Sequence, residues 1–508
     1  MALLYKNNCF SPFMGDNRPI SVGLNPLGIR TASEQLFTTL LPGLNVVTLR
    51  IRYYSFYCWL LKSFYEHRTE AKRLDFQCHI RMSELLMALI HAYSNNNAGI
   101  PGIIRALEIV GREDEIINFR ENAIPNGDPE KRYWKGPSGA FGSYYAASLQ
   151  EMGLIRPLID NPSLYNITLK TEEYISGEKL ADAFSKSIGN DMCKLFLDCA
   201  NTGKVTRQQL AVLEPAFQSH NLPDNQEREI LLQMLLQNDR PSSHIESRLR
   251  YNSLCLLLSY INDTQLSGFS DLDFAKYVYD SYKNGERTSL AAAGWYAYYL
   301  NDSRQYEALL IFDVILNRLQ KSTKPGQWEN LDEFTTQLSS EVCKALNVEQ
   351  NTLQELFDNW NSITEPEEQM AHAFYIILDN YRSNSNYKNC KSIIRTSFHN
   401  VSNDALDAFD TIELSLNKPV NQFVKHFLTE SIIYNHYSES MRKYSQNGIL
   451  TQKLTIENGY VRGLDVYYAT HSSPRIDTLR NFAIDLGLIN HNRITDRGKE
   501  LLNNIHND

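Results

Sequence analysis

Hydrophobic residues recur with helical spacing along most of the chain. From about residue 33 onward, apolar positions follow one another at intervals of three and four, which is the period of one helix face. Breakers such as Pro42-Gly43 separate these stretches. The pattern predicts helices over 33–41, 46–66, 80–95, 102–111, 178–200, 205–217, 225–237, 243–262, 272–283, 288–300, 303–320, 330–346, 350–362, 365–382, 403–414, 419–446, 474–487 and 496–505.

Alternating strand patterns are scarce. They are confined to 163–169, 449–456 and 460–469. The last two runs flank Asn458-Gly459, and Asn-Gly between alternating runs is a strong hairpin signal. The predicted fold class is therefore mainly α, a multi-helix architecture with a short β-hairpin near 449–469.

Two distant segments, 143–185 and 475–504, share one pattern. In each, a predicted helix ends in Gly-Leu-Ile, an Ile-Thr pair follows an extended stretch, and a Gly-charged-charged-Leu sequence opens another helix. Gly153 and Gly487 suit the left-handed conformation that ends many helices, because glycine adopts it at little cost. The other paired residues are Leu154 and Leu488, Ile155 and Ile489, Ile167 and Ile494, Thr168 and Thr495, and Gly177 and Gly498.

This order resembles the last half of winged-helix domains of bacterial regulators, over about 75 of the 508 residues. The resemblance implies one or two winged-helix-like elements. It also implies that the helices at 143–152 and 475–486 are recognition helices. Residues 475–508 carry five Lys or Arg and five Asp or Glu, so packing against a protein is an alternative to nucleic-acid contact. The candidate contacts are Tyr144, Arg475, Arg480, Arg493 and Arg497.

Loop-rich segments and the resemblance together predict four domains. The first is a helical N-terminal domain, 1–130, with an irregular arm at 1–30. The second, 131–240, contains a winged-helix-like segment and further helices. A helical array at 241–415 follows, and 416–508 contains a helix, the hairpin and the second winged-helix-like element.

Basic and aromatic residues alternate over 50–81, where Arg50, Arg52 and Lys62 are candidate nucleic-acid contacts. The same aromatic spacing also fits a buried helix face with a solvated basic side. Lys131, Arg132 and Lys135 precede a glycine-rich helix start, where backbone N–H groups could hold a DNA phosphate. A structured loop is the alternative for this segment, since no P-loop signature is present.

Composition narrows the classes of protein. Hydrophobic residues make up 43% and charged residues 21%, which excludes global disorder. The net charge of −9 argues against an evenly basic nucleic-acid binder. The eight cysteines lack metal or redox spacing and predict buried free thiols in a reducing cytoplasm. We see neither a secretory signal nor an apolar run of membrane-spanning length, so we expect no membrane contact.

No catalytic motif identifies a reaction. The histidines lack metal-ligand spacing, and no nucleophile elbow is present, so we expect no metal site and no cofactor. Asp271, Asp273 and Lys276 fit a nuclease metal site less well than a helix start, where acidic side chains complement the dipole.

The amino-acid sequence of residues 23–28 and 40–61 resembles sequences of uncharacterised bacterial proteins encoded in phage-defence operons. This resemblance implies a non-catalytic subunit of a bacterial multiprotein complex. Such a subunit would bind nucleic acid, scaffold a partner ATPase or nuclease, or do both, with other protein subunits as partners and DNA as a further one. The alternatives are an effector enzyme, such as a nuclease with a site hidden in the sequence, or a winged-helix transcription regulator.

Overall fold

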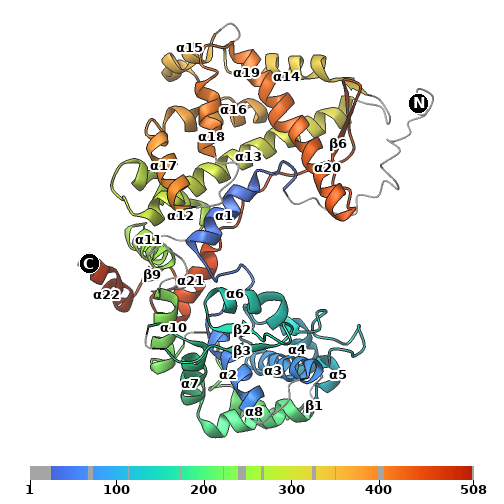
Figure 1. The fold of residues 1–508 in the computed structure, drawn as a ribbon, viewed down its shortest axis with the longest axis vertical. Helices are drawn as coiled ribbons and strands as arrows, with labels where there is room; N and C mark the ends of the chain where they lie inside the picture. Colours follow the sequence, from blue (N-terminus) through green and yellow to red (C-terminus); the bar gives the residue numbers. More distant parts are fainter. Residues whose placement is uncertain are drawn as a thin grey trace, which may run out of the picture. The chain divides into compact units, whose positions relative to one another are not determined.

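A computed structural model describes residues 25–66, 72–112, 114–171, 173–220, 222–237, 248–264, 268–322, 328–348, 351–398 and 405–505. Over these ranges the chain is mainly helical, with a few short antiparallel strand pairs, as Figure 1 shows. The predicted fold class is thereby confirmed. No helix in these ranges has both the length and the apolar character needed to cross a bilayer. The boundary predicted between residues 240 and 241 and most of the predicted arm lie outside the described residues.

The chain divides into two compact units, and each unit collects segments that are distant in sequence. The described residues of unit 1 fall within Met1–Phe37, Val278–Thr288 and Ala293–Ser472. Those of unit 2 fall within Thr38–Tyr277, Ser289–Ala292 and Ser473–Asp508. The domain boundaries predicted after residues 130 and 415 lie inside unit 2 and unit 1, respectively.

Three helices contain unit boundaries: α1 (Arg30–Leu40), α12 (Asp271–Lys283) and α13 (Leu290–Ser322). The other elements of unit 2 are α2 (Arg52–Glu66), α3 (Arg73–Tyr93), α4 (Ile103–Val110), β1 (Ile116–Asn118), α5 (Arg120–Ala123), η2 (Phe141–Tyr145), α6 (Ala146–Glu151), β2 (Ile155–Pro157), β3 (Tyr165–Ile167), α7 (Gly177–Ile188), α8 (Asn190–Thr202), β4 (Lys204–Thr206), α9 (Arg207–Leu213), α10 (Gln226–Leu236), α11 (Leu249–Thr264), α21 (Ile476–Asp485), β8 (Ile489–Asn490), β9 (Arg493–Ile494) and α22 (Asp496–Ile505). Strand β1 pairs with β4, β2 with β3, and β8 with β9, all antiparallel.

Unit 1 contains β5 (Glu329–Asn330), α14 (Leu331–Ala345), α15 (Leu353–Asp358), η3 (Trp360–Ser362), α16 (Gln369–Arg382), α17 (Tyr387–Ser397), α18 (Ala405–Glu413), α19 (Val420–His426), η4 (Phe427–Tyr434), α20 (Asn435–Asn447), β6 (Leu454–Glu457) and β7 (Tyr460–Gly463). Its sheet has the order β5-β7-β6. The turn between β6 and β7 places Asn458 and Gly459 at φ of 49° and 79°, as a type I′ hairpin turn requires. The hairpin predicted from Asn-Gly is confirmed, with shorter strands than the sequence pattern suggests.

Helix α2 lies at the centre of unit 2. Every residue from Arg52 to Leu61 is buried, and the helix packs extensively against α7. Trp59 lies in a cluster of rings that includes Phe184 and Phe196, at centroid distances of 5.2 and 5.7 Å. The aromatic spacing of this segment therefore builds a core, and its rings are not exposed for stacking on bases.

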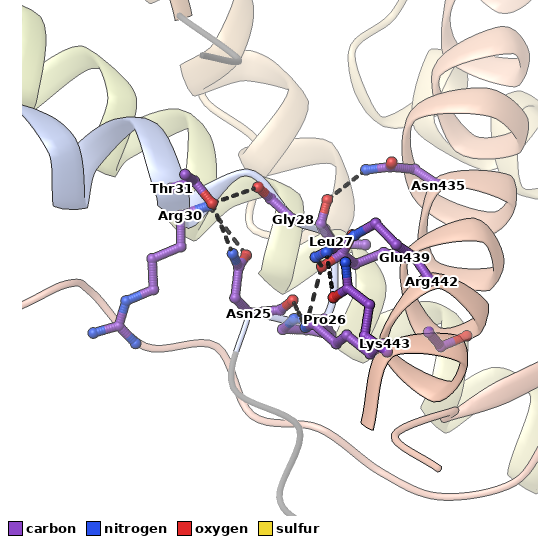
Figure 2. Close-up of polar contacts among 12 residues, drawn as sticks. Asn25, Pro26, Leu27, Gly28, Arg30, Thr31, Asn435, Glu439, Arg442 and Lys443 are labelled. Carbon is purple, nitrogen blue, oxygen red and sulfur yellow. Dashed lines mark hydrogen bonds and ion pairs between the residues drawn. The ribbon is translucent and has the colours of Figure 1, made fainter. Parts of the chain in front are cut away.

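Figure 2 shows how the chain from Asn25 to Thr31 docks on helix α20 within unit 1. Asn435 donates to the Leu27 carbonyl at 2.6 Å, and Lys443 donates to the Asn25 carbonyl at 2.7 Å. The Asn25 side chain accepts from the Arg30 N–H at 3.1 Å and so closes the turn that leads into α1. This part of the predicted arm packs on the body of unit 1.

Helix boundaries differ from the predictions where polar side chains find partners within the fold. The predicted helices 288–300 and 303–320 form one helix, α13. Asn301 donates to the Ala297 carbonyl at 2.9 Å, and its side-chain oxygen accepts from the Ala405 N–H at 2.9 Å. Because these polar atoms are satisfied within the fold, the helix continues.

The predicted helix 178–200 instead breaks at Gly189, whose φ is 85°. Helix α17 is absent from the predictions, because its apolar stripe is short.

Candidate functional site

The two segments that share a sequence pattern both form a helix, a two-stranded hairpin and a second helix in unit 2. We call η2, α6, β2, β3 and α7 the first module, and α21, β8, β9 and α22 the second. In each module the first helix ends at a glycine with positive φ, 74° at Gly153 and 72° at Gly487. The strands pair as Ile155 with Ile167 and as Ile489 with Ile494. The winged-helix assignment itself stays a prediction.

One threonine in each module joins the hairpin to both helices. The Thr168 N–H donates to the Leu154 carbonyl at 2.9 Å, its hydroxyl donates to the Gly153 carbonyl at 2.8 Å, and this hydroxyl accepts from the Gly177 N–H at 2.9 Å. Thr495 makes the same three bonds, to Leu488, Gly487 and Gly498, at 3.0, 2.7 and 3.1 Å. We call each set of bonds the threonine clasp. Its repetition shows that the sequence echo corresponds to a repeated local structure.

A glycine at the start of the second helix completes each clasp. A Cβ atom added to Gly177 would lie 2.1 Å from the Leu154 carbonyl oxygen. At Gly498 the same atom would lie 2.3 Å from the Leu488 carbonyl oxygen. Real Cβ atoms do not approach backbone oxygens this closely, so both positions require glycine.

The tips of the two hairpins differ in chemistry. In the first module, Ile159 is 96% exposed at the tip, and Leu169 is 64% exposed just after β3. In the second module the corresponding turn carries His491 and Asn492, and Arg493 is exposed beside them. Residues 490–496 line an open recess there. The same clasp thus supports one tip that exposes an isoleucine beside Asp160 and one tip that carries His491 and Asn492.

Five of the candidate basic residues form ion pairs inside unit 2, and the pair of Lys131 with Glu121 is the most exposed. Arg50 donates to the buried Asp485 at 2.9 Å, and Lys62 donates to Asp182 at 2.6 Å. Arg497 pairs with Glu229. Arg52 is 1% exposed and donates two hydrogen bonds to Glu227, at 3.2 and 3.0 Å. Its charge is neutralised in the core, so Arg52 does not face solvent.

Other candidates bind backbone or neighbouring side chains. Arg132 donates to the Pro125 carbonyl at 3.0 Å, and Arg475 donates to the Leu44 carbonyl at 2.6 Å. Lys131 lies 3.4 Å from Glu121, and the Tyr144 ring meets the Trp134 ring edge-on at 4.9 Å. Arg480 donates to Asn492 at 2.7 Å, which joins α21 to the second hairpin.

Lys135 and Arg493 remain exposed. The structure does not bring the eleven candidate residues together into one surface. Thr478, on the same helix as Arg480, is 1% exposed and donates to the Asn45 carbonyl. This face of the supposed recognition helix is therefore turned into the fold.

The glycine-rich helix start at 136–142 already binds an anion from within the chain. Glu84 is 1% exposed and accepts from the N–H groups of Ala140 and Phe141 at 2.9 and 2.6 Å. The Tyr57 hydroxyl donates to the same carboxylate at 2.9 Å, and so does the Tyr133 hydroxyl. Burial raises the pKa of Glu84, and these four donors oppose that rise. The amides that could hold a phosphate thus serve Glu84, and the segment is a structured loop.

Sequence reasoning missed a polar cluster in unit 1. Asp302 is buried and accepts from His471 Nδ1 at 2.8 Å and from the Ser472 N–H at 2.8 Å. The Ser472 hydroxyl also donates to Asp302, at 2.5 Å. The His471 ring stacks on Tyr306 with centroids 3.9 Å apart. No local signal could reveal this cluster, since about 170 residues separate Asp302 from its partners.

This cluster holds an imidazole in a fixed orientation, as a general base requires. However, the serine hydroxyl bonds to the aspartate rather than to the imidazole, so no nucleophile–base pair forms. Within the described ranges, no group of three or more His, Cys, Asp or Glu side chains could hold a metal ion. Asp271 and Asp273 lie in the first turn of α12, as the sequence predicts.

Comparison with known protein families, curated proteins and solved structures yields no significant match.

Proposed function

We propose that this chain is a non-catalytic subunit of a protein complex, and that the hairpin β2–β3 contacts a partner protein through the exposed Ile159 at its tip. The observation that carries the proposal is the 96% exposure of Ile159. Burying a side chain of this size stabilises an association by roughly 1.5–3 kcal/mol.

The second module supports this interpretation. Its threonine clasp is the same, yet its hairpin turn carries His491 and Asn492. A tip without an exposed isoleucine is thus compatible with this local structure, and folding alone does not require Ile159 there. We infer that Ile159 serves binding rather than stability.

Nucleic-acid contact is the second candidate, and Arg493 favours it. Arg493 is exposed on the second hairpin, and Lys135 is exposed ahead of the first module. Most other candidate cations, such as Arg50 and Arg497, pair with carboxylates of the chain. Phosphate binding depends on clustered positive charge, and this pairing favours a protein partner.

The resemblance to proteins of phage-defence operons extends the proposal to a bacterial defence complex, with an ATPase or nuclease as the partner. The alternatives of an effector enzyme and a transcription regulator are less well supported. The Asp302 cluster lacks a nucleophile–base pair, and the candidate recognition helix turns Thr478 inward.

The proposal is tested by purifying the tagged chain from its own cells in three forms: unaltered, Ile159→Asp and Ile104→Asp. Ile104 is 76% exposed on α4, so its variant is a control for the same substitution elsewhere in unit 2. We expect the unaltered chain and Ile104→Asp to retain the same partner protein, and Ile159→Asp to lose at least tenfold of it at an unchanged Tm. Equal recovery in all three forms would contradict the proposal.

The second candidate is tested by titrating labelled DNA at two salt concentrations. The double variant Lys135→Ala/Arg493→Ala is compared with Lys344→Ala/Lys418→Ala, which removes two exposed cations of unit 1. Salt-sensitive binding that only the first pair abolishes would favour nucleic acid over protein as the ligand of these modules.

A further inference from the structure

Unit 1 contains a cavity of about 260 Å³ among α13, α16, α18, α19 and the π-helical segment η4. An apolar cavity of about 150 Å³ is large enough to bind benzene. This cavity therefore has room for a fused pair of small rings. Most of its wall is apolar, and the side chains that make it so are Leu300, Ile377, Phe409, Ile412, Phe423 and Phe427.

Aromatic rings form much of this wall. The rings of Phe423 and Phe427 have their centroids 6.3 Å apart and their planes tilted by 38°. Phe409 contributes a third ring from α18. Aromatic rings attract one another in edge-to-face and offset arrangements, because the ring edge is positive and the ring face is negative. The wall therefore suits a flat aromatic ligand better than a flexible aliphatic chain.

The charged groups of the wall are engaged within the chain. Asp407 pairs with Lys391 at 2.6 Å and with Arg395. Arg304, which also lines the cavity, has an interaction of its own within the chain. An ionic ligand would thus leave water without gaining a counter-charge, and burying an unpaired charge is costly. The cavity favours a neutral ligand.

One uncharged polar group of the wall has an unused bonding position. Asn380 on α16 donates through Nδ2 to the Ser303 hydroxyl at 2.9 Å. No described residue donates a hydrogen bond to its Oδ1 atom. An amide oxygen accepts from N–H or O–H groups, so a ligand that carries such a group would satisfy it. Cavities of this kind, apolar with a few polar groups, are typical ligand sites between packed helices.

The backbone at the cavity is unusual. Helices α19 and α20 are joined by η4, where eight residues are wound as a π-helix. Phe427 and Ser431 of this segment line the cavity. π-Helical turns are rare in proteins and occur often at functional sites. The unusual winding thus coincides with the cavity wall.

We propose that this cavity binds a small neutral aromatic molecule with one N–H or O–H group, with its rings among the phenylalanines and that group donating to Asn380 Oδ1. The site belongs to unit 1, and the proposal does not depend on the function proposed for the two modules of unit 2.

Isothermal titration calorimetry with indole and benzofuran tests the proposal, since the two probes share a shape and only indole carries an N–H group. We expect one indole per chain, bound about fivefold more tightly than benzofuran because of the hydrogen bond. Indole-3-acetate, which adds a carboxylate, should bind at least about tenfold more weakly than indole. No binding of indole, equal affinities of indole and benzofuran, or tighter binding of the carboxylate would each overturn the proposal.

The Asn380→Leu variant places the hydrogen bond. It should bind indole and benzofuran equally, with the affinity for benzofuran unchanged. The control is Asn389→Leu on the exposed face of α17, which should keep the preference for indole. A preference for indole that persists in Asn380→Leu would overturn the role of this side chain.

A variant that fills the cavity locates the rings. Ala408→Phe on α18 adds a ring to the wall, and Ser392→Phe on the exposed face of α17 is the control. With a cooperative unfolding transition retained, we expect Ala408→Phe to abolish the binding of both probes and the control to preserve it. Unchanged affinity in folded Ala408→Phe would overturn the assignment. The Asn380→Leu comparison decides the question if Ala408→Phe does not fold.

Discussion

Glu307 on α13 is a buried carboxyl group with little compensation. It is 7% exposed, and among the described residues its Oε2 atom has no hydrogen-bond partner. Burial raises its pKa to about 7, and His471 opposes the rise. The pKa of an unfolded Glu is about 4.3, so between that value and 7 the folded chain binds more protons than the unfolded chain. The contribution of Glu307 to stability is therefore lost as pH rises from about 4 through 7.

The Glu307→Gln variant should remove this loss. We expect its free energy of unfolding to exceed that of the unaltered chain at pH 8, by up to about 3 kcal/mol, with no such gain near pH 4. Urea unfolding at both pH values measures the difference. Parallel pH profiles for the two chains would show that Glu307 does not titrate as described.

The contribution of His436 to stability depends on pH in the opposite direction. It is fully buried, its Nδ1–H donates to the Pro26 carbonyl at 2.9 Å, and its Nε2 accepts from the Lys453 N–H at 2.9 Å. Burial lowers the pKa of His436 to about 4. An unfolded histidine binds a proton near pH 6.5, so the stability from this residue is lost as pH falls from 6.5 to 4.

We expect His436→Gln to lower the free energy of unfolding at pH 7 by about 2 kcal/mol. The variant should also lose less stability than the unaltered chain as the pH falls from 6.5 to 4. The control is His426→Gln, because His426 is exposed on α19. Unfolding at several pH values tests the stability, and the ¹⁵N chemical shift of Nε2 reports directly whether the ring stays neutral at pH 5.5. A protonated ring at that pH would contradict the account.

Among the elements, the clasped hairpins make the sharpest mutational prediction. Gly177→Ala and Gly498→Ala should each lower the free energy of unfolding of unit 2 by more than 2 kcal/mol, because the new methyl meets a backbone carbonyl. Thr168→Val and Thr495→Val should cost about 1–2 kcal/mol each through lost hydrogen bonds. Gly268→Ala is the control, since no atom lies within 4 Å of its added Cβ. Equal effects at Gly268 and Gly498 would refute the steric argument.

The sequence predicts the elements better than it predicts their partners. The apolar period of α2 and the Asn-Gly turn are local signals, and both led to the observed structures. The repeated Gly-Leu-Ile and Ile-Thr pattern also led to a repeated local structure. By contrast, the partner of Arg52 is Glu227, 175 positions away, and no local pattern encodes that pair. A basic residue on a helix therefore suggested a charged surface where the fold has a buried ion pair.

The candidate site was predictable only in part for the same reason. The sequence around Lys135 predicts a helix start that could bind an anion, and in the fold its backbone N–H groups bind the carboxylate of Glu84. The exposure of Ile159 has no sequence signature, because a hairpin tip and a buried strand can carry the same residue type. Both features follow from tertiary packing, which a single sequence does not display.

At the scale of the whole molecule, the net charge and the exposed residues both favour a protein partner over nucleic acid. The chain carries a net charge of −9, and most of its candidate nucleic-acid contacts are paired internally. Unit 2 nevertheless contains one local structure twice and exposes Ile159 at the tip of the first hairpin. These features together fit a binding subunit that recognises protein through the first module.

The most direct test is to replace Ile159 with the photoreactive p-benzoylphenylalanine and irradiate living cells. The matched position is Asn492, at the polar tip of the second module. We predict a discrete adduct at position 159 that protease removes and nuclease leaves intact, with no equivalent adduct at position 492. An adduct that nuclease removes, or no adduct at position 159, would contradict the claim that this hairpin binds a protein.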